Sequence, residues 1–370
     1  MRKSRRAASV VEATTVGGPS AHYDTLAANT VEAAEYYGLS IVYGCVSLIA
    51  GKISSLPVIV EDENTGEYAN RPRWVDRPDT SGIIPLTWPD VVSAAATSLL
   101  LDGNAYVAVV RDSRSRVQRI QVLHPGAVSL ALRHNAYQIL VLGEVPEFDV
   151  LMMRHIVNPG SVKGINPIHA ARLTLETSYG VSRVSSSFFE QGAVTPGVVS
   201  IPTEVDESVI QGVADSWKKA HGGMDNAHLP IVMQDATYQS IGVSPEDAQF
   251  LETRRYTDAQ IAGQIFHIEP ALMGVSQRSG KGSGALTYQN IGQQNRQLVE
   301  TALMPIITRL EAGFSSLLPK GICMRFDLSE FLRADVLARF KTYEAAADIG
   351  EKLGEPLITA EEIRRREGWA

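Results

Sequence analysis

The stretch SPEDAQFLETRRYTDAQIAGQIFHIEPALMGVSQRSGKGSGALTYQNIGQQNRQLVETALMPIITRLEAGFSSLL (residues 244–318) predicts a helix, a glycine-rich loop and a second, longer helix. Ser244 is a good N-cap, Pro245 suits the first helical position, and two acidic residues follow in the first turn. The first helix should stop near Glu269, because the residue before a proline is pushed out of the α region.

The loop between these helices combines flexibility with positive charge. Residues 274–284 contain four glycines and three serines, so we expect the segment to be mobile. Residues 271–298 include Arg278, Lys281 and Arg296 but no acidic residue, although the formal net charge of the chain is −7. A locally basic loop in an acidic protein suggests contact with a polyanion. The alternative is a surface loop with incidental basic residues.

The second helix should run from about Leu286 to Leu318, where a proline and a glycine end it. Its first half is rich in amides, and its second half carries an apolar stripe at helical spacing. The stripe consists of Leu298, Ala302, Ile306, Leu310, Phe314 and Leu317. Pro305 lies within the helix and predicts a kink.

Composition places the chain among folded proteins. Its 370 residues are enough for two or three domains or one elongated fold, and 44% hydrophobic content excludes global disorder. Cys45 and Cys323 show neither a disulfide framework nor zinc spacing. The longest apolar run, residues 91–101, is too short to span a bilayer. A sequence pI of about 5.7 argues against nucleic-acid binding over the whole surface.

The remaining chain predicts an α/β platform followed by a stalk. Residues 1–34 should be an arm; helices follow at 36–54 and after Thr87, the second ending at Gly103. Five strand-like runs at 106–110, 117–123, 128–132, 137–142 and 150–157 predict an antiparallel meander. A long helix to about Gln191 and the helix after Ser244 bracket a small module of strand, helix and two strands at 198–243. This order predicts an antiparallel helix pair with a module at its tip. A strand at 322–328 and C-terminal helices complete the chain.

Known catalytic and cofactor-binding motifs do not fit this sequence. Gly274 precedes Gly280-Lys281 with one residue too many for a P-loop, and a helix rather than a strand comes before it. His221, Asp225 and His228 could in principle hold a metal, but their glycine- and asparagine-rich context favours a solvated loop. We therefore expect no enzymatic activity, cofactor or metal, and favour a mechanical or binding role.

Many short segments, in the right order from about Tyr36 to Trp369, resemble the HK97-type family of tailed-bacteriophage portal proteins. The clearest are Tyr43-Gly-Cys-Val-Ser-Leu-Ile-Ala, Leu99-Leu-Leu-Asp-Gly-Asn-Ala-Tyr-Val, Val122-Leu-His-Pro, Gly164-Ile-Asn-Pro-Ile-His-Ala-Ala-Arg, Phe188-Phe-Glu-Gln-Gly-Ala, Phe250-Leu-Glu-Thr-Arg-Arg and Phe266-His-Ile-Glu-Pro-Ala-Leu-Met-Gly.

The resemblance implies an elongated α+β subunit with an α/β wing, a two-helix stem, a small α/β clip, a kinked tunnel helix and a helical C-terminal crown. The implied boundaries are 1–34 for a flexible arm, 35–166 and 298–327 for the wing, 167–193 and 244–268 for the stem helices, 194–243 for the clip, 269–297 for the tunnel loop and the start of its helix, and 328–370 for the crown.

The resemblance also implies a function: a dodecameric ring at one capsid vertex, assembled in the host cytoplasm, through which double-stranded DNA is packaged and ejected. Expected partners are the terminase large subunit, a head–tail adaptor and the major capsid protein, and no membrane. The expected channel-facing residues are Gln277, Arg278, Ser279, Lys281, Ser283, Gln289, Gln293 and Arg296. The expected docking residues on the clip are Trp217, Lys218, Lys219 and His221. For Trp217, packing in the clip core is an equally open alternative.

Two other classes of function stay open at this point. An ATPase using the glycine-rich loop would show ATP-dependent turnover. A non-portal scaffold or adaptor, of a virus-like particle or gene transfer agent, would show another ring size or an open assembly. A closed twelvefold ring with an axial channel would support the portal interpretation.

Overall fold

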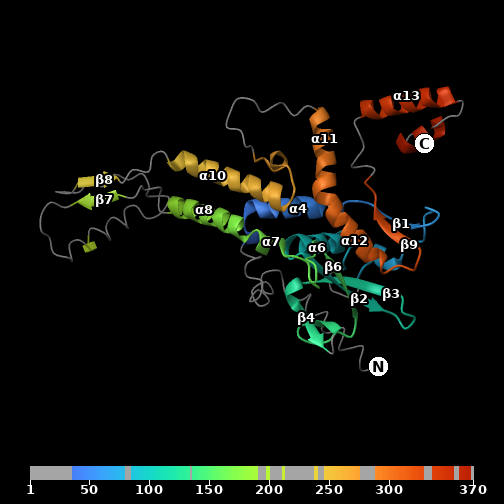
Figure 1. Ribbon diagram of the computed structural model, residues 1–370, viewed down its shortest axis with the longest axis horizontal. Helices are drawn as coiled ribbons and strands as arrows, with labels where there is room; N and C mark the ends of the chain where they lie inside the picture. The colour runs from blue at the N-terminus through green and yellow to red at the C-terminus, as the bar shows by residue number, and fades with distance from the viewer. Residues whose placement is uncertain are drawn as a thin grey trace.

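The computed structural model describes residues 36–79, 85–133, 136–190, 197–200, 211–212, 237–240, 246–275, 288–328, 336–353 and 358–367. The subunit is elongated: a compact platform of helices and strands carries a pair of helices that extends to one side and reaches strands β7 and β8 (Figure 1). We use platform for helices α4, α6 and α12 with strands β1–β6 and β9.

The platform helices form because their apolar residues fall on broad faces. α4 (Ser40–Ser54) and α6 (Trp88–Leu101) each bury seven residues, and they pack against each other. The expected start of α6 is confirmed, since Thr87 and Asp90 form a reciprocal capping box. Gly103 ends the helix with a φ of 79°, a conformation that favours glycine.

Strand order in the platform differs from the meander that the sequence predicts. β2 (Asn104–Arg111) lies between β3 (Val117–Leu123) and β6 (Asp149–Arg154), antiparallel to both. β4 (Val128–Arg133) and β5 (Ala136–Val141) form a separate hairpin. The prediction of one meander was therefore wrong.

The reason for this order is the burial of β2 on both of its faces. Ala105 and Val107 enter the large core, whereas Tyr106 and Ala108 enter a smaller core shared with residues of β3, β4 and β5. A strand buried on both faces is best placed in the centre of a sheet. The chain leaves the sheet at the 3₁₀ turn η2 (Pro125–Ala127), and β6 later returns to the other edge of β2.

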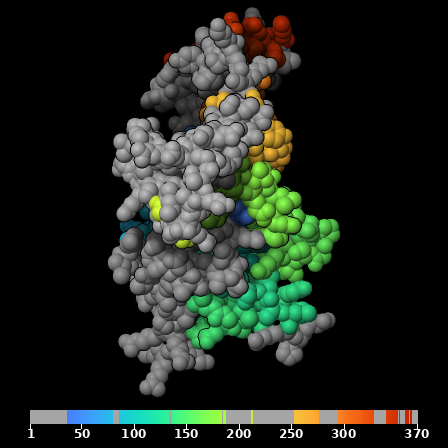
Figure 2. Space-filling view, turned by 90° about the vertical axis from the view of Figure 1, so that its left-hand side faces the viewer, coloured from blue at the N-terminus to red at the C-terminus, as the bar shows by residue number. Residues whose placement is uncertain are grey.

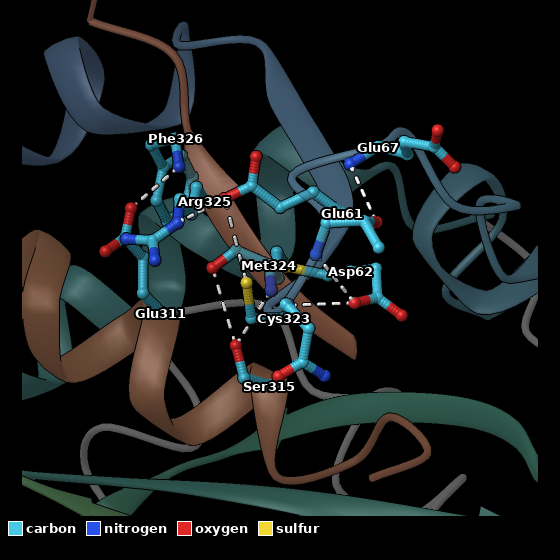
Figure 3. Close-up of polar contacts among 11 residues, drawn as sticks. Glu61, Asp62, Glu67, Glu311, Ser315, Cys323, Met324, Arg325 and Phe326 are labelled. Atoms are coloured by element: carbon cyan, nitrogen blue, oxygen red, sulfur yellow. Dashed lines mark hydrogen bonds and ion pairs between the residues drawn. The ribbon is translucent and has the colours of Figure 1, made fainter. Parts of the chain in front are cut away.

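The beginning and end of the platform meet in a second sheet. β1 (Val58–Asp62) pairs antiparallel with β9 (Ile322–Phe326). Helix α12 (Met304–Ser315) holds β9 through two backbone contacts (Figure 3): Phe326 N–H donates to the Glu311 carboxylate at 2.8 Å, and Met324 N–H donates to Ser315 Oγ at 2.9 Å. An ion pair between Glu61 and Arg325 joins the two strands.

The helix pair begins with a short helix, α7 (Pro167–Ala170), capped by the Asn166 side chain, which accepts from His169 N–H at 2.9 Å. The chain then breaks at Ala171 and continues as α8 (Arg172–Glu190), so the single helix predicted from Asn166 is two. α10 (Glu246–Gln260) lies beside α8 (Figure 1). β7 (Gly197–Ser200) pairs antiparallel with β8 (Thr237–Ser240). The predicted helix and the third strand between them lie outside the described residues, except for a helical stretch at 211–212.

The C-terminal part consists of α13 (Val336–Leu353) and α14 (Ala360–Glu367), in agreement with the C-terminal helices that the sequence predicts. Figure 2 shows these helices, in red, at one end of the molecule and the β4–β5 region, in blue-green, at the other. A further short helix, α5 (Arg73–Asp76), lies between β1 and α6 in the chain. In the part of the chain that the structure describes, no helix is long and apolar enough to cross a membrane.

Candidate nucleic-acid channel element

The candidate channel element is the glycine-rich loop with the helices that precede and follow it. The helix that precedes the loop is α10 with its extension. α10 passes directly into a π-helical turn, η4 (Ile261–Ile265), and the helix ends at Phe266. This end lies three residues before the predicted stop at Glu269. The cause is His267, whose φ of 55° is in the left-handed region and cannot continue a helix. Pro270 then opens a 3₁₀ helix, η5 (Pro270–Met273).

The helix that follows the loop is the amide-rich helix that the sequence predicts. α11 (Tyr288–Leu298) leads through another π-helical turn, η6 (Val299–Leu303), into α12, and Figure 1 shows α11 and α12 running in different directions. Pro305 explains the irregularity, because a proline has no N–H to donate to the carbonyl of Thr301 and its ring crowds that carbonyl. The wider π turn just before the proline relieves this conflict.

The two π turns are held together. The Thr301 hydroxyl, in η6, lies within hydrogen-bond distance of two carbonyl oxygens that share its single proton: that of His267 at 2.9 Å and that of Gln297 at 2.8 Å. Both turns pack on α4, and each contributes buried residues such as Ile261 and Leu303. The segment between them, which contains the glycine-rich loop, therefore starts and ends at one fixed point of the platform.

The predicted apolar stripe is confirmed. Leu298, Ala302, Ile306, Leu310 and Phe314 are buried, and Leu317 is half-buried. This face packs α12, η6 and the end of α11 into the large core of the platform.

The predicted channel-facing residues fall into two groups. Gln277, Arg278, Ser279, Lys281 and Ser283 lie outside the described residues. The other three, Gln289, Gln293 and Arg296, lie on α11, and the side chains of Gln293 and Arg296 are exposed. Arg296 forms an exposed ion pair with Glu300 at 3.9 Å, a contact that leaves its guanidinium accessible to water.

The residues predicted for docking at the clip, Trp217, Lys218, Lys219 and His221, also lie outside the described residues. The same holds for Asp225 and His228, which were considered with His221 as metal ligands. Among the residues that the structure does describe, no group of three or more His, Cys, Asp and Glu side chains could hold a metal ion.

The structure also brings basic side chains near one another that no sequence pattern pointed to. The pKa of His155, at the end of β6, is lowered by burial first and then by the nearby charges of Arg309 and His267. These residues come from three different elements, so no local pattern in the sequence brings them together. Burial and these basic neighbours therefore favour the neutral form of the His155 imidazole.

The connection from the platform to the helix pair, which begins with α7 and α8, requires close backbone packing. A side chain at Gly103 would overlap the carbonyl oxygen of Ile165, and one at Gly164 would overlap the carbonyl oxygen of Gly103. The two segments around Gly103 and Gly164 therefore pack backbone against backbone, which fixes where α7 and α8 leave the platform.

Taken together, the elements define a platform from which two structured arms emerge: a helix pair that reaches a β module, and an amide-rich helix beyond a glycine-rich loop. Comparison with known proteins identifies this class. The model of the phage portal protein family matches residues 40–368, and the chain belongs to that family. The resemblance found in the sequence to HK97-type portal proteins is confirmed.

Individual relatives agree with this assignment. The chain is 30% identical over 313 residues to a probable portal protein of Streptomyces phage phiC31, covering 79% of this chain and 66% of that protein. It is 26% identical over 365 residues to the portal protein of Enterobacteria phage HK97, covering 94% and 82%.

Solved structures share the fold at low identity. An HK97 family phage portal protein from Corynebacterium diphtheriae has a TM-score of 0.60 at 14% identity, over 82% of this chain and 96% of that one. A chain from the neck of a native gene transfer agent particle, computed with C12 symmetry, has a TM-score of 0.56 at 18% identity, over 94% and 93%. The mixed helix and strand architecture is thus that of portal proteins.

Proposed function

We propose that twelve copies of this chain form a closed ring at one vertex of a capsid, and that double-stranded DNA enters and leaves through the ring. Membership of the portal family supports this proposal, as does the C12 symmetry of the neck that contains a structural neighbour. The ring would be part of the virion, assembled in the host cytoplasm, and would have no enzymatic activity of its own.

The parts of the subunit have the roles that the resemblance implies. The platform is the wing, α8 and α10 are the stem, the β7–β8 module is the clip, α11 with the preceding loop is the tunnel element, and α13 and α14 belong to the crown. The clip would dock the terminase large subunit and later the head–tail adaptor, and the outer part of the ring would contact the major capsid protein.

The observation that carries the proposal is the anchoring of the tunnel element. The hydroxyl of Thr301 and the carbonyl of His267 join the segments that precede and follow the glycine-rich loop. The segment from His267 to Thr301, which contains the loop and α11, is thus held at its two ends and would extend from there into a channel. Because every fixed phosphate contact adds affinity through counterion release, a few movable cations would let DNA slide where many rigid ones would hold it. Arg278 and Lys281 would supply these cations.

A two-stage experiment tests the proposal. Electron microscopy and native mass spectrometry of the purified chain should show a closed twelvefold ring with an axial channel. Particles assembled with Arg278→Glu/Lys281→Glu should then package less DNA per unit time, while their rings keep the same mass. The matched control is Arg114→Glu/Lys320→Glu, which makes the same charge change at exposed platform positions. Normal packaging and ejection by the loop variant would refute the channel assignment.

The second candidate is a portal of a gene transfer agent, because several structural neighbours come from such particles. The two candidates predict the same ring but different cargo. Sequencing the DNA inside particles built with this chain separates them: a single viral genome supports the phage portal, and fragments of cellular DNA support the gene transfer agent.

A further inference from the structure

A groove of about 1420 Å³ opens on the platform, away from the stem and from the tunnel element. It lies between residues 69–79, the tip of the β2–β3 hairpin, residues 147–148 just before β6, and the segment 317–322 that follows α12. In Figure 1 these elements lie at the end of the molecule opposite β7 and β8. The groove is thus a surface that neither the proposed clip nor the proposed channel uses.

The floor of the groove is apolar and firmly supported. Trp74, Val117, Leu317, Leu318 and Ile322 are among the lining residues. The Trp74 ring lies 6.1 Å from that of Trp88 and 6.5 Å from that of Phe314, so the floor is continuous with the platform core. A preformed concave surface with apolar side chains is typical of a binding site.

The lining also carries an excess of arginine. It contains Arg73, Arg77, Arg111, Arg116 and Arg119, against the acids Asp79, Asp112 and Glu147. This excess occurs in a chain whose net charge is −7, so it is local.

Two of these guanidinium groups are available to a ligand. Arg111 pairs with Asp149 at 2.7 Å, and Arg116 pairs with Asp112 at 2.9 Å. Arg73 and Arg77 are exposed, and neither forms an ion pair within the described part of the chain. Both lie at α5, directly beside the Trp74 floor.

We propose that this groove binds an extended segment of another protein in which Asp or Glu residues alternate with apolar residues. The carboxylates would pair with Arg73 and Arg77, and the apolar side chains would cover the floor between them. A nucleic acid fits less well, because it has no apolar side chains to cover the floor.

A random 12-residue peptide library displayed on yeast tests the proposal, because such a library samples many acidic and apolar patterns at once. The library is sorted for binding to the full-length assembled protein and counter-sorted against Arg73→Glu/Arg77→Glu. Enriched peptides should be acidic and contain at least two apolar residues. Their fluorescein-labelled forms should bind the wild type about tenfold more tightly than the double variant in fluorescence anisotropy, since two exposed ion pairs are lost. The affinity should also fall as salt is added.

A control is Arg114→Glu, which reverses an exposed arginine on the β2–β3 hairpin that borders the groove but lies outside the lining. It should bind the enriched peptides like the wild type. Circular dichroism and native mass spectrometry verify that all variants fold and assemble.

Four outcomes would overturn the proposal: no enrichment, enrichment of basic or neutral peptides, equal binding by Arg73→Glu/Arg77→Glu, or tighter variant-sensitive binding of a 30-base-pair duplex used as the nucleic-acid probe. A change in ring mass with the double variant would also overturn it, because the groove would then be an interface between copies of this chain.

Discussion

The side chain of Asn104 is hydrogen-bonded to the backbone of Gly164 in both directions. The N–H of Gly164 donates to the Asn104 Oδ1 at 2.7 Å, and the Asn104 amide donates to the carbonyl of Gly164 at 3.4 Å. Asn104 is 2% exposed and stands at the start of β2, and Gly164 lies just before the stem. The Asn104 side chain therefore connects the central strand of the platform to the segment that leads into α7 and α8.

Replacing Asn104 with alanine should lower the stability of the subunit by about 1–3 kcal/mol, because the N–H of Gly164 would lose its partner in a partly buried site. Thermal unfolding of the full chain measures the effect. Asn158→Ala, a change of the same size in an exposed loop, should have little effect. Equal melting temperatures for the two variants would show that the contact is dispensable.

A second prediction concerns Gly313, where α12 meets β6. An alanine there would collide with Sδ and Cγ of Met153. Overpacking of this kind costs about 1–3 kcal/mol, which outweighs the gain of about 1 kcal/mol from replacing a helical glycine with alanine. Gly313→Ala should therefore destabilise the protein in thermal unfolding.

Whether Gly313→Ala destabilises or stabilises the protein should depend on the side chain at position 153. In a Met153→Ala background the collision is gone, so Gly313→Ala should become neutral or stabilising. Gly51→Ala on α4, with open space around the added methyl group, should raise the melting temperature. A destabilising effect of Gly313→Ala in both backgrounds would contradict the packing argument.

The third prediction is a pH dependence from His155. Its folded pKa is lowered, so the unfolded chain binds a proton more readily, and stability is lost as the pH falls below the ordinary histidine value of about 6.5. Asp102, Asp258 and Glu311 have raised pKa values, chiefly from burial, so their contribution to stability increases as the pH falls.

The comparison with His155→Gln separates the effect of the histidine from that of the carboxyl groups. This variant should lose less stability than the wild type between about pH 7 and pH 5. Parallel profiles would argue against a neutral His155.

The fourth prediction concerns the hydrogen bond between Thr301, in the second π turn, and His267, two residues after the first. Thr301→Val keeps the shape of the side chain but removes the hydroxyl that reaches the carbonyl of His267. Hydrogen exchange of the backbone N–H groups of residues 266–275 should become faster by up to about tenfold, as expected for the loss of one hydrogen bond of about 1 kcal/mol.

Thr308→Val is the matched control for this experiment. Thr308, on α12, donates to the carbonyl of Met304 at 2.8 Å, one turn earlier in its own helix. Its loss should leave exchange in 266–275 unchanged. Thr301→Ser, which keeps the hydroxyl, should behave like the wild type.

Local signals in the sequence predicted local structure well. The capping box of Thr87 and Asp90, the glycine that ends α6 and the apolar stripe from Leu298 to Phe314 are all present. Each depends on residues a few positions apart, so the pattern contains the whole interaction. The order of helix, module and helix was enough to predict a stalk with a β pair at its end.

Features that depend on distant residues could not be predicted in this way. The place of β6 beside β2 follows from the burial of both faces of β2, which depends on other elements. Residues 104 and 164 are 60 positions apart, and nothing near either one indicates the contact. For the candidate site, the channel-facing role of Gln293 and Arg296 stays a prediction, whereas the groove at Arg73 and Arg77 is formed by four separate segments, which no local pattern connects.

The pairing of β1 with β9 has a consequence for how the subunit is made. Glu61 and Arg325 are 264 positions apart, so the sheet cannot close until most of the polypeptide has left the ribosome. Until then the backbone N–H and C=O groups along the edge of β1 lack their partner strand, and the unfinished subunit is exposed to misassembly. A chain whose synthesis stops early would therefore never complete its platform.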